Sequence, residues 1–181
     1  MGSSVVRVLF DTTVLCAAIR NPRGLNMGLL KLALVGLIEP VITQEVVAEW
    51  VGNCRAGLGG VAITEEDLDA FCDLMEPMLS EPMIARVRMG RAMGPLEPIT
   101  ETAGALIIQA PIGHEQQTQV INDQVLALKD PHDRHIVVAA LQDACDCICT
   151  ANTRDFPDGM RFNKLEFITP KRLYHALLAA P

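Results

Sequence analysis

The sequence lacks a hydrophobic run long enough to cross a membrane. Its best candidate, residues 29–38, is broken by Lys31 and Gly36, whereas a membrane-spanning helix needs about 18–20 apolar residues. A secretory signal is not expected either, because Arg7 falls within the first apolar stretch and Asp11 ends it. These two observations predict a cytoplasmic protein that is not anchored in a membrane.

A CxxC pair is also missing, although the chain contains six cysteines. Such a pair would have suggested a zinc site or a redox motif. Cys145, Cys147 and Cys149 instead alternate along a predicted strand, so they share one of its faces. We expect buried, reduced thiols, as in most cytosolic proteins, rather than zinc ligands or disulfides.

Positive charge is not in excess. The 15 Lys and Arg residues are outnumbered by 22 Asp and Glu residues, which gives a net charge of −7. This balance argues against a protein that coats nucleic acid by bulk charge. It does not exclude a nuclease, because a cluster of carboxylates that binds a metal ion would itself add negative charge.

Internal repeats, low-complexity tracts and linkers are absent, so we expect a single domain over residues 1–181. Half of the residues are apolar, which is enough for a substantial core. The predicted strands are 5–10, 40–42, 145–150 and 166–168. The predicted helices are 14–19, 25–35, 44–53, 64–78, 131–143 and 170–179. Residues 82–125 are the least readable, with a helix expected at 83–93 and a strand at 104–109. Strands that alternate with helices predict an α/β fold with a central parallel sheet covered on both faces.

Acidic residues stand where such a sheet binds ligands, at the carboxyl ends of its strands. Asp11 directly follows the first predicted strand. Glu45 and Glu49 lie on the helix that Thr43 caps, and the helical wheel places Glu49 nearer the apolar face. Taken singly, Asp11 could be a helix cap and both glutamates could be solvated surface acids.

Asp133 is the most informative acid, because the helical wheel places it in the middle of an apolar face. That face consists of Ile136, Val137, Ala140 and Leu141. A carboxylate directed at a core is unfavourable unless another group pairs with it. The alternative is a capping box, with Asp130 as N-cap and Pro131 at the first helical position.

The last acid, Asp155, follows the strand that ends at Thr150, with Asn152 between them. A solvated loop would explain Asp155 equally well when it is taken alone. Together, however, Asp11, Glu49, Asp133 and Asp155 would meet at one edge of a parallel sheet. Their mutual repulsion would be relieved by Mg²⁺ or Mn²⁺, which prefer oxygen ligands. A site of this kind suits hydrolysis of a phosphodiester.

Four segments make the sequence similar to the PIN-domain family. They are Val-Leu-Phe-Asp-Thr-Thr-Val-Leu (8–15), Ile-Thr-Gln-Glu-Val-Val-Ala-Glu (42–49), Asp-Pro-His-Asp-Arg-His-Ile-Val-Val-Ala-Ala (130–140) and Cys-Thr-Ala-Asn-Thr-Arg-Asp-Phe-Pro (149–157). Their order and spacing resemble the bacterial branch of toxin components of toxin–antitoxin pairs (VapC-like). The similarity covers about residues 5–80 and 128–178, whereas 82–125 is longer than the usual connection.

This resemblance implies a three-layer α/β/α sandwich with a central parallel sheet. It also implies a Mg²⁺- or Mn²⁺-dependent endoribonuclease that cuts single-stranded RNA and leaves a 5′-phosphate and a 3′-hydroxyl. By motif, the catalytic and metal-binding acids are Asp11, Glu49, Asp133 and Asp155, with Thr150 and Asn152 ordering the site. Asn152 stands where many members have Asp, and Thr13 where many have Asn, which leaves the fourth ligand open between Asp155 and none. The family often forms homodimers, and this branch pairs with a cognate antitoxin protein.

Five arginines are candidates for contacts with RNA phosphates. They are Arg86, Arg88 and Arg91, in a segment without acids, and Arg134 and Arg154, next to predicted ligands. The alternative is a solvated helix face on which the Arg stems pack. His132 and His135 flank Asp133 and are interpreted as surface residues at the helix start rather than as a general acid.

Other functions fit the sequence less well. A phosphatase of the haloacid-dehalogenase type needs a second Asp two residues after the first, where this chain has Thr13. A dinucleotide-binding protein needs a GxGxxG motif after its first strand, and none is present. A PIN-like interaction module without catalysis stays open, because Thr13 and Asn152 depart from the family pattern.

Overall fold

The computed structural model describes residues 5–81, 83–84, 87, 125, 127–128, 130–162 and 164–179. Several expectations therefore lie outside the described residues. They are the predicted strand 104–109, most of the predicted helix 83–93, the side chain of His132, and Arg86, Arg88 and Arg91.

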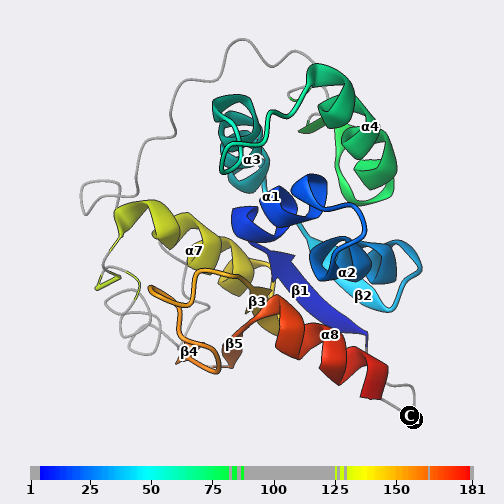
Figure 1. Ribbon diagram of the computed structural model, residues 1–181. Coiled ribbons are helices and arrows are strands. Elements are labelled where there is room, and N and C mark those ends of the chain that lie inside the picture. Colours follow the sequence, from blue (N-terminus) through cyan, green and yellow to red (C-terminus); the bar gives the residue numbers. More distant parts are fainter. Residues whose placement is uncertain are drawn as a thin grey trace.

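A five-stranded sheet with the strand order β2-β1-β3-β5-β4 forms the centre of the protein (Figure 1). The strands are β1 (Val6–Phe10), β2 (Ile38–Val41), β3 (Cys147–Cys149), β4 (Arg161–Phe162) and β5 (Leu165–Ile168). The first four strands in this order pair in parallel, as predicted. β4 is a difference from the expected parallel sheet, since it pairs antiparallel with β5 through a short hairpin.

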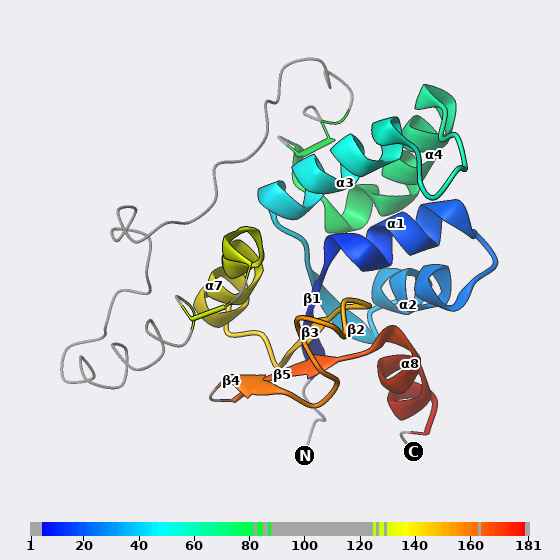
Figure 2. The ribbon, with the colours of Figure 1, turned by 60° about the vertical axis from the view of Figure 1, so that its left-hand side comes forward.

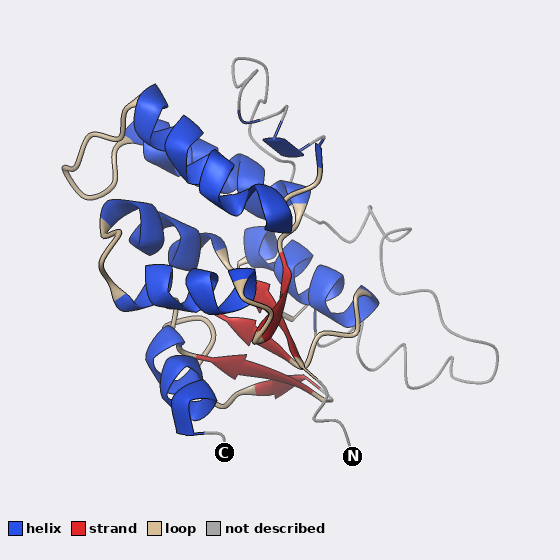
Figure 3. Cartoon of the chain, turned by 90° about the vertical axis from the view of Figure 1, so that its right-hand side faces the viewer, coloured by secondary structure: helices blue, strands red, loops and turns tan. Residues whose placement is uncertain are grey.

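Helices cover both faces of this sheet, which confirms the predicted α/β sandwich. They are α1 (Thr12–Arg20), α2 (Leu25–Leu34), α3 (Gln44–Ala56), α4 (Glu65–Met75), α7 (Arg134–Gln142) and α8 (Pro170–Ala179). Figure 2 shows α7 on one side of the strands and α1, α2 and α8 on the other, and Figure 3 shows the strands enclosed between helices. α3 and α4 pack against α1, beyond the ends of the strands that carry the candidate site.

Local sequence signals fix several of these boundaries. The side chain of Thr43 accepts a hydrogen bond from the backbone N–H of Val46 at 3.2 Å, which confirms it as the cap of α3. Thr64 and Asp67 form a reciprocal capping box at the start of α4. Gly36 has a φ of 78° just after α2, a conformation that glycine adopts without a steric penalty.

The boundary of β2 differs from the prediction by two residues. The strand begins at Ile38, which is 1% exposed and pairs with Val6, whereas the sequence predicted a start at Pro40. Pro40 lies inside the strand, and this is possible because β2 is an edge of the sheet.

The core lies between the sheet and its helices. Val8, Leu9 and Phe10 of β1 and Ile148 of β3 are fully buried, as expected for strands covered on both faces. Cys145, Cys147 and Cys149 are buried free thiols, as predicted. None of the helices in the described segments has the length and apolar character that a bilayer crossing requires.

Candidate functional site

Asp11 is a buried carboxylate held by two hydroxyl groups. It directly follows β1, and its side chain is 5% exposed. Thr13 and Thr150 each donate a hydrogen bond of 2.6 Å to its Oδ2. Hydrogen bonds to an ionised acceptor are stronger than those between neutral groups. Because both hydroxyls donate to Oδ2, the orientation of the carboxyl group is fixed, and neither donor engages Oδ1.

A backbone contact joins this pair of threonines to the loop after β3. The N–H of Ala151 donates to Thr13 Oγ1 at 3.0 Å, and the N–H of Asn152 donates to Thr150 Oγ1 at 2.9 Å. The Asp11 N–H also donates to the Cys149 carbonyl at 3.1 Å. The carboxyl ends of β1 and β3 are therefore tied together around the Asp11 side chain. Thr150, to which the resemblance assigns a site-ordering role, is one of the two residues that hold the Asp11 side chain.

Glu49 reaches toward the same edge of the sheet from α3. Its Oε2 accepts a hydrogen bond of 2.8 Å from Thr12 Oγ1, and Thr12 is 2% exposed. Glu45, one turn earlier on α3, is exposed and has no hydrogen bond within the described residues. The preference of the helical wheel for Glu49 over Glu45 is therefore consistent with the contacts.

Asp133 lies in a 3₁₀ turn, Pro131–Asp133, that leads into α7. Asp133 is the N-cap residue of α7, and its side chain makes no capping hydrogen bond to that helix. Burial, together with the negative charges of Asp130, Asp11, Asp155 and Glu49, raises the pKa of Asp133 to about 6. The charges of all three other predicted acids thus act on the pKa of Asp133.

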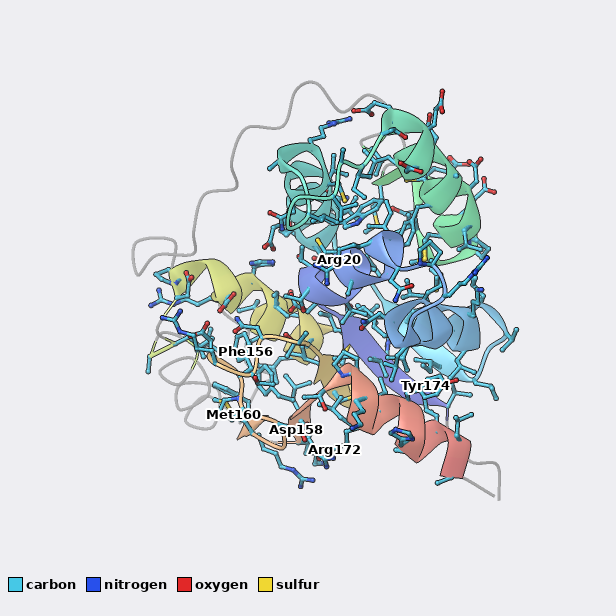
Figure 4. All side chains as sticks on the ribbon, viewed as in Figure 1. Arg20, Phe156, Asp158, Met160, Arg172 and Tyr174 are labelled. Carbon is cyan, nitrogen blue, oxygen red and sulfur yellow. The ribbon has the colours of Figure 1, made fainter. Side chains whose placement is uncertain are left out.

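The loop that carries Asp155 is anchored by its neighbour. Phe156, labelled in Figure 4, is 2% exposed and stacks on Phe167 of β5 with ring centroids 4.5 Å apart. Asn152 Oδ1 accepts a weak hydrogen bond of 3.4 Å from the Asp155 N–H. Asn152 therefore contacts the turn that carries Asp155, and its role in ordering the site stays a prediction.

Two of the five predicted arginines, Arg134 and Arg154, lie within the described residues. Arg134 is partly buried at the start of α7, and Arg154 is exposed in the loop after β3, one residue before Asp155. His135 is partly buried rather than on the surface. Two hydroxyl residues were missed as site residues, Thr12 and Thr13. Their position directly after Asp11 was the only available signal.

The donor set fits a hard divalent cation in ligand type and charge. Within the described ranges, no Lys or Arg forms an ion pair with Asp11, Glu49, Asp133 or Asp155. No basic side chain of the described residues therefore compensates their like charges through an ion pair. As the side chains stand, no three His, Cys, Asp or Glu residues in the described part of the chain form a group that could hold a metal ion. The four acids therefore suit a divalent cation in the type and charge of their ligand atoms. Mg²⁺ commonly contacts carboxylates in proteins while it keeps several of its waters.

Comparison with known protein families shows which family the chain belongs to. The family model described as PIN domain matches residues 7–154, which is most of the chain. The chain belongs to the PIN domain family. PIN domains are typically nucleases that act on RNA with divalent metals, so membership indicates nuclease-type activity. The match ends one residue before Asp155 and covers the other three predicted acids. No curated protein matches the chain.

Proposed function

We propose that this PIN-domain protein is a metal-dependent endoribonuclease that hydrolyses single-stranded RNA. The observation that carries the proposal is the half-buried carboxylate of Asp133, on which the negative charges of Asp11, Glu49 and Asp155 act and which forms no ion pair with a Lys or Arg of the described residues. The electrostatics agree with the family, because a cluster of acids at the carboxyl edge of a parallel sheet suits a divalent cation.

Asp11, Asp133 and Asp155 would hold Mg²⁺ or Mn²⁺, with Glu49 beside them. When bound, the ion supplies a Lewis acid that offsets phosphate charge and lowers the pKa of water. Thr13 and Thr150 keep Asp11 Oδ2 in one orientation, and Thr12 holds Glu49. Glu49 either binds the ion directly or orients the attacking water. No Ser, Cys or His nucleophile is required, and the products carry a 5′-phosphate and a 3′-hydroxyl.

RNA has to approach a chain of net charge −7, so local positive charge is needed. We assign this role to Arg134 and Arg154 beside the acids, together with Arg86, Arg88 and Arg91, which lie outside the described residues. Contacts of Arg with phosphates position a nucleic acid without reading its sequence. Together, these five arginines would place a phosphodiester over Asp11 and Asp133.

Cleavage of a labelled single-stranded RNA by Asp11→Asn tests the proposal. The variant should lose cleavage in Mg²⁺ or Mn²⁺, and chelation with EDTA should abolish cleavage by the parent. Asp69→Asn is the matched control, since Asp69 is exposed on α4, outside the candidate site. If Asp11→Asn cuts as fast as the parent, the proposal fails.

By the resemblance to the toxin branch, we further propose that the protein acts in the cytoplasm as a homodimer and as the toxin of a type II toxin–antitoxin pair. A small neighbouring gene whose product binds this protein and suppresses its cleavage would support that role. Light scattering of the purified protein tests the homodimer.

A second candidate function is a PIN-like interaction module that has lost part of its metal site. It is favoured by the lack of a ready-made ligand group among the described residues and by Asn152 at a position where many members have Asp. Calorimetric titration with Mn²⁺ separates the two. Binding that Asp11→Asn removes supports the nuclease, and no heat of binding in the parent supports the module.

A further inference from the structure

Hydroxyl groups occupy both lone pairs of one oxygen of the Asp11 carboxylate. The Thr13 and Thr150 hydroxyls each donate to Oδ2 at 2.6 Å. A carboxylate oxygen has two lone pairs, so two donors at this distance use the full hydrogen-bonding capacity of Oδ2. In the described part of the chain, every hydrogen bond that the Asp11 carboxylate accepts ends on Oδ2. Asp11 therefore presents one open oxygen, Oδ1, to a cation.

The loop after β3 fixes the direction of both hydroxyl protons. The Ala151 N–H donates to Thr13 Oγ1 at 3.0 Å, and the Asn152 N–H donates to Thr150 Oγ1 at 2.9 Å. A backbone N–H can only donate, so each hydroxyl accepts from the loop and keeps its own proton for Asp11. The two hydroxyl oxygens lie 3.5 Å apart, a contact too long to compete with bonds of 2.6 Å. Neither hydroxyl can therefore turn its proton away from Oδ2 without breaking a short hydrogen bond.

Glu49 is not restricted in this way. Its carboxylate accepts one hydroxyl, from Thr12, on Oε2, so Oε2 keeps a second lone pair. The Glu49 side chain is also exposed, whereas Asp11 is buried. Of these two acids, Asp11 is the one whose binding mode the protein constrains.

We propose that Thr13 and Thr150 restrict Asp11 to binding a cation through Oδ1 alone, and that this restriction makes the site select Mg²⁺ over Ca²⁺. Mg²⁺ requires a nearly octahedral shell and keeps several waters, whereas Ca²⁺ takes about six to eight oxygens and can bind both oxygens of one carboxylate. A single open oxygen on Asp11 suits the first ion and withholds a ligand from the second. Thr13 is thus a residue that determines metal specificity. This inference rests on the proposed function, since it takes the acidic site to be the metal site.

Calorimetric titration of the full chain with Mg²⁺ and with Ca²⁺ tests the inference through the ratio of the two affinities. The parent should bind Mg²⁺ more tightly than Ca²⁺. Thr13→Val keeps the side-chain volume but removes the donor to Oδ2 and the acceptor of the Ala151 N–H. Loss of a group that orients a ligand typically weakens metal binding about 10–100-fold. Mg²⁺ should bear this loss, while Ca²⁺ gains access to Oδ2, so the preference for Mg²⁺ should fall about 10-fold or more.

Two matched variants separate this role from a purely structural one. Thr13→Ser keeps the hydroxyl, and Thr153→Val changes an exposed position of the same loop, so both should keep the parental ratio. A structural defect would weaken the binding of both cations alike. The inference is overturned if Thr13→Val keeps the parental ratio, or if the parent binds Ca²⁺ as tightly as Mg²⁺. Neither result removes the metal site, whereas a parent that binds no Mg²⁺ overturns the proposed function as well.

A crystal of the parent soaked in Mn²⁺ shows the binding mode directly, even where Thr13→Val fails to fold. Mn²⁺ also accepts octahedral oxygen sites, and its anomalous scattering locates it. We expect the ion to contact Oδ1 of Asp11 and not Oδ2. Contact with Oδ2 overturns the inference but leaves the proposed function in place, and an ion bound away from Asp11 overturns both.

Discussion

Thr150 donates a hydrogen bond of 2.6 Å to Oδ2 of Asp11, although the two residues are 139 positions apart in the sequence. They meet because β1 and β3 are neighbouring parallel strands and both residues follow the last residue of their strand. Asp11 is consequently oriented by a side chain that belongs to the other end of the chain. The site can form only once the sheet has closed.

Replacing Thr150 by Val tests the contribution of that hydrogen bond. Val has nearly the same shape, so the change keeps the side-chain volume but removes both the donor to the buried Asp11 carboxylate and the acceptor of the Asn152 N–H. We expect the free energy of unfolding to fall by about 1–3 kcal/mol, as measured by urea denaturation. Thr153→Val, at an exposed position of the same loop, is the control and should change stability little. Equal stabilities of the two variants would contradict the assigned role.

The pKa of Asp133 makes stability depend on pH in a defined direction. Burial raises this pKa from 3.8 to about 6, so the folded state binds the proton more tightly than the unfolded state. As pH rises between these values, the folded state loses stability relative to the unfolded one. Asp133→Asn removes this penalty. In EDTA, the variant should gain stability over the parent between about pH 4 and pH 6 and keep the gain at higher pH.

Urea denaturation of both proteins over this pH range measures the effect. Asp69→Asn, at an exposed position on α4, should follow the parent at every pH. A difference between Asp133→Asn and the parent that does not change with pH would show that the pKa of Asp133 is not raised in the folded state.

Glu49 and Glu45 provide a matched pair on one helix. Both are exposed on α3, but only Glu49 accepts the hydrogen bond from Thr12. Glu49→Gln should lower the rate of Mg²⁺-dependent RNA cleavage on the order of 10–100-fold. Glu45→Gln carries the same change of charge away from the acids and should leave the rate unchanged. Equal rates for the two variants would remove Glu49 from the site.

Arg154 should contribute to the binding of RNA phosphates. Removing one phosphate contact lowers the slope of the logarithm of affinity against the logarithm of salt concentration by about 0.7–1. We expect this change for Arg154→Ala, measured with single-stranded RNA and the inactive Asp11→Asn background. Arg23→Ala is the control, because Arg23 is exposed in the turn between α1 and α2. If both variants give the parental slope, Arg154 does not contact phosphate.

Features that depend on local patterns could be predicted from the sequence. The run at Val6–Phe10 and the caps at Thr43 and Thr64 each act over a few neighbouring residues. The helical wheel singled out Asp133 because a carboxylate on an apolar face is unusual, and its raised pKa agrees with that reasoning. The roles of all four acids in catalysis stay predictions.

Features that depend on distant partners could not be predicted. The bond from Thr12 to Glu49 requires α3 to lie against α1, which no local pattern specifies. β4 escaped prediction because two residues carry no periodicity, and its pairing comes from the hairpin with β5. Thr13 was noted only as a departure from the family pattern, while its hydroxyl in fact bridges Asp11 and the loop after β3.

Both margins of the sheet are unsuited to recruiting another strand. At one margin, Pro40 has no N–H to offer across the outer side of β2. At the other, β4 is only two residues long. Within the described segments, two copies therefore have no continuous ribbon of free backbone along which to join. A homodimer that uses the described part of the chain would have to be built from its helix surfaces, and the same short, proline-containing edges protect this sheet from stacking into fibres through its strands.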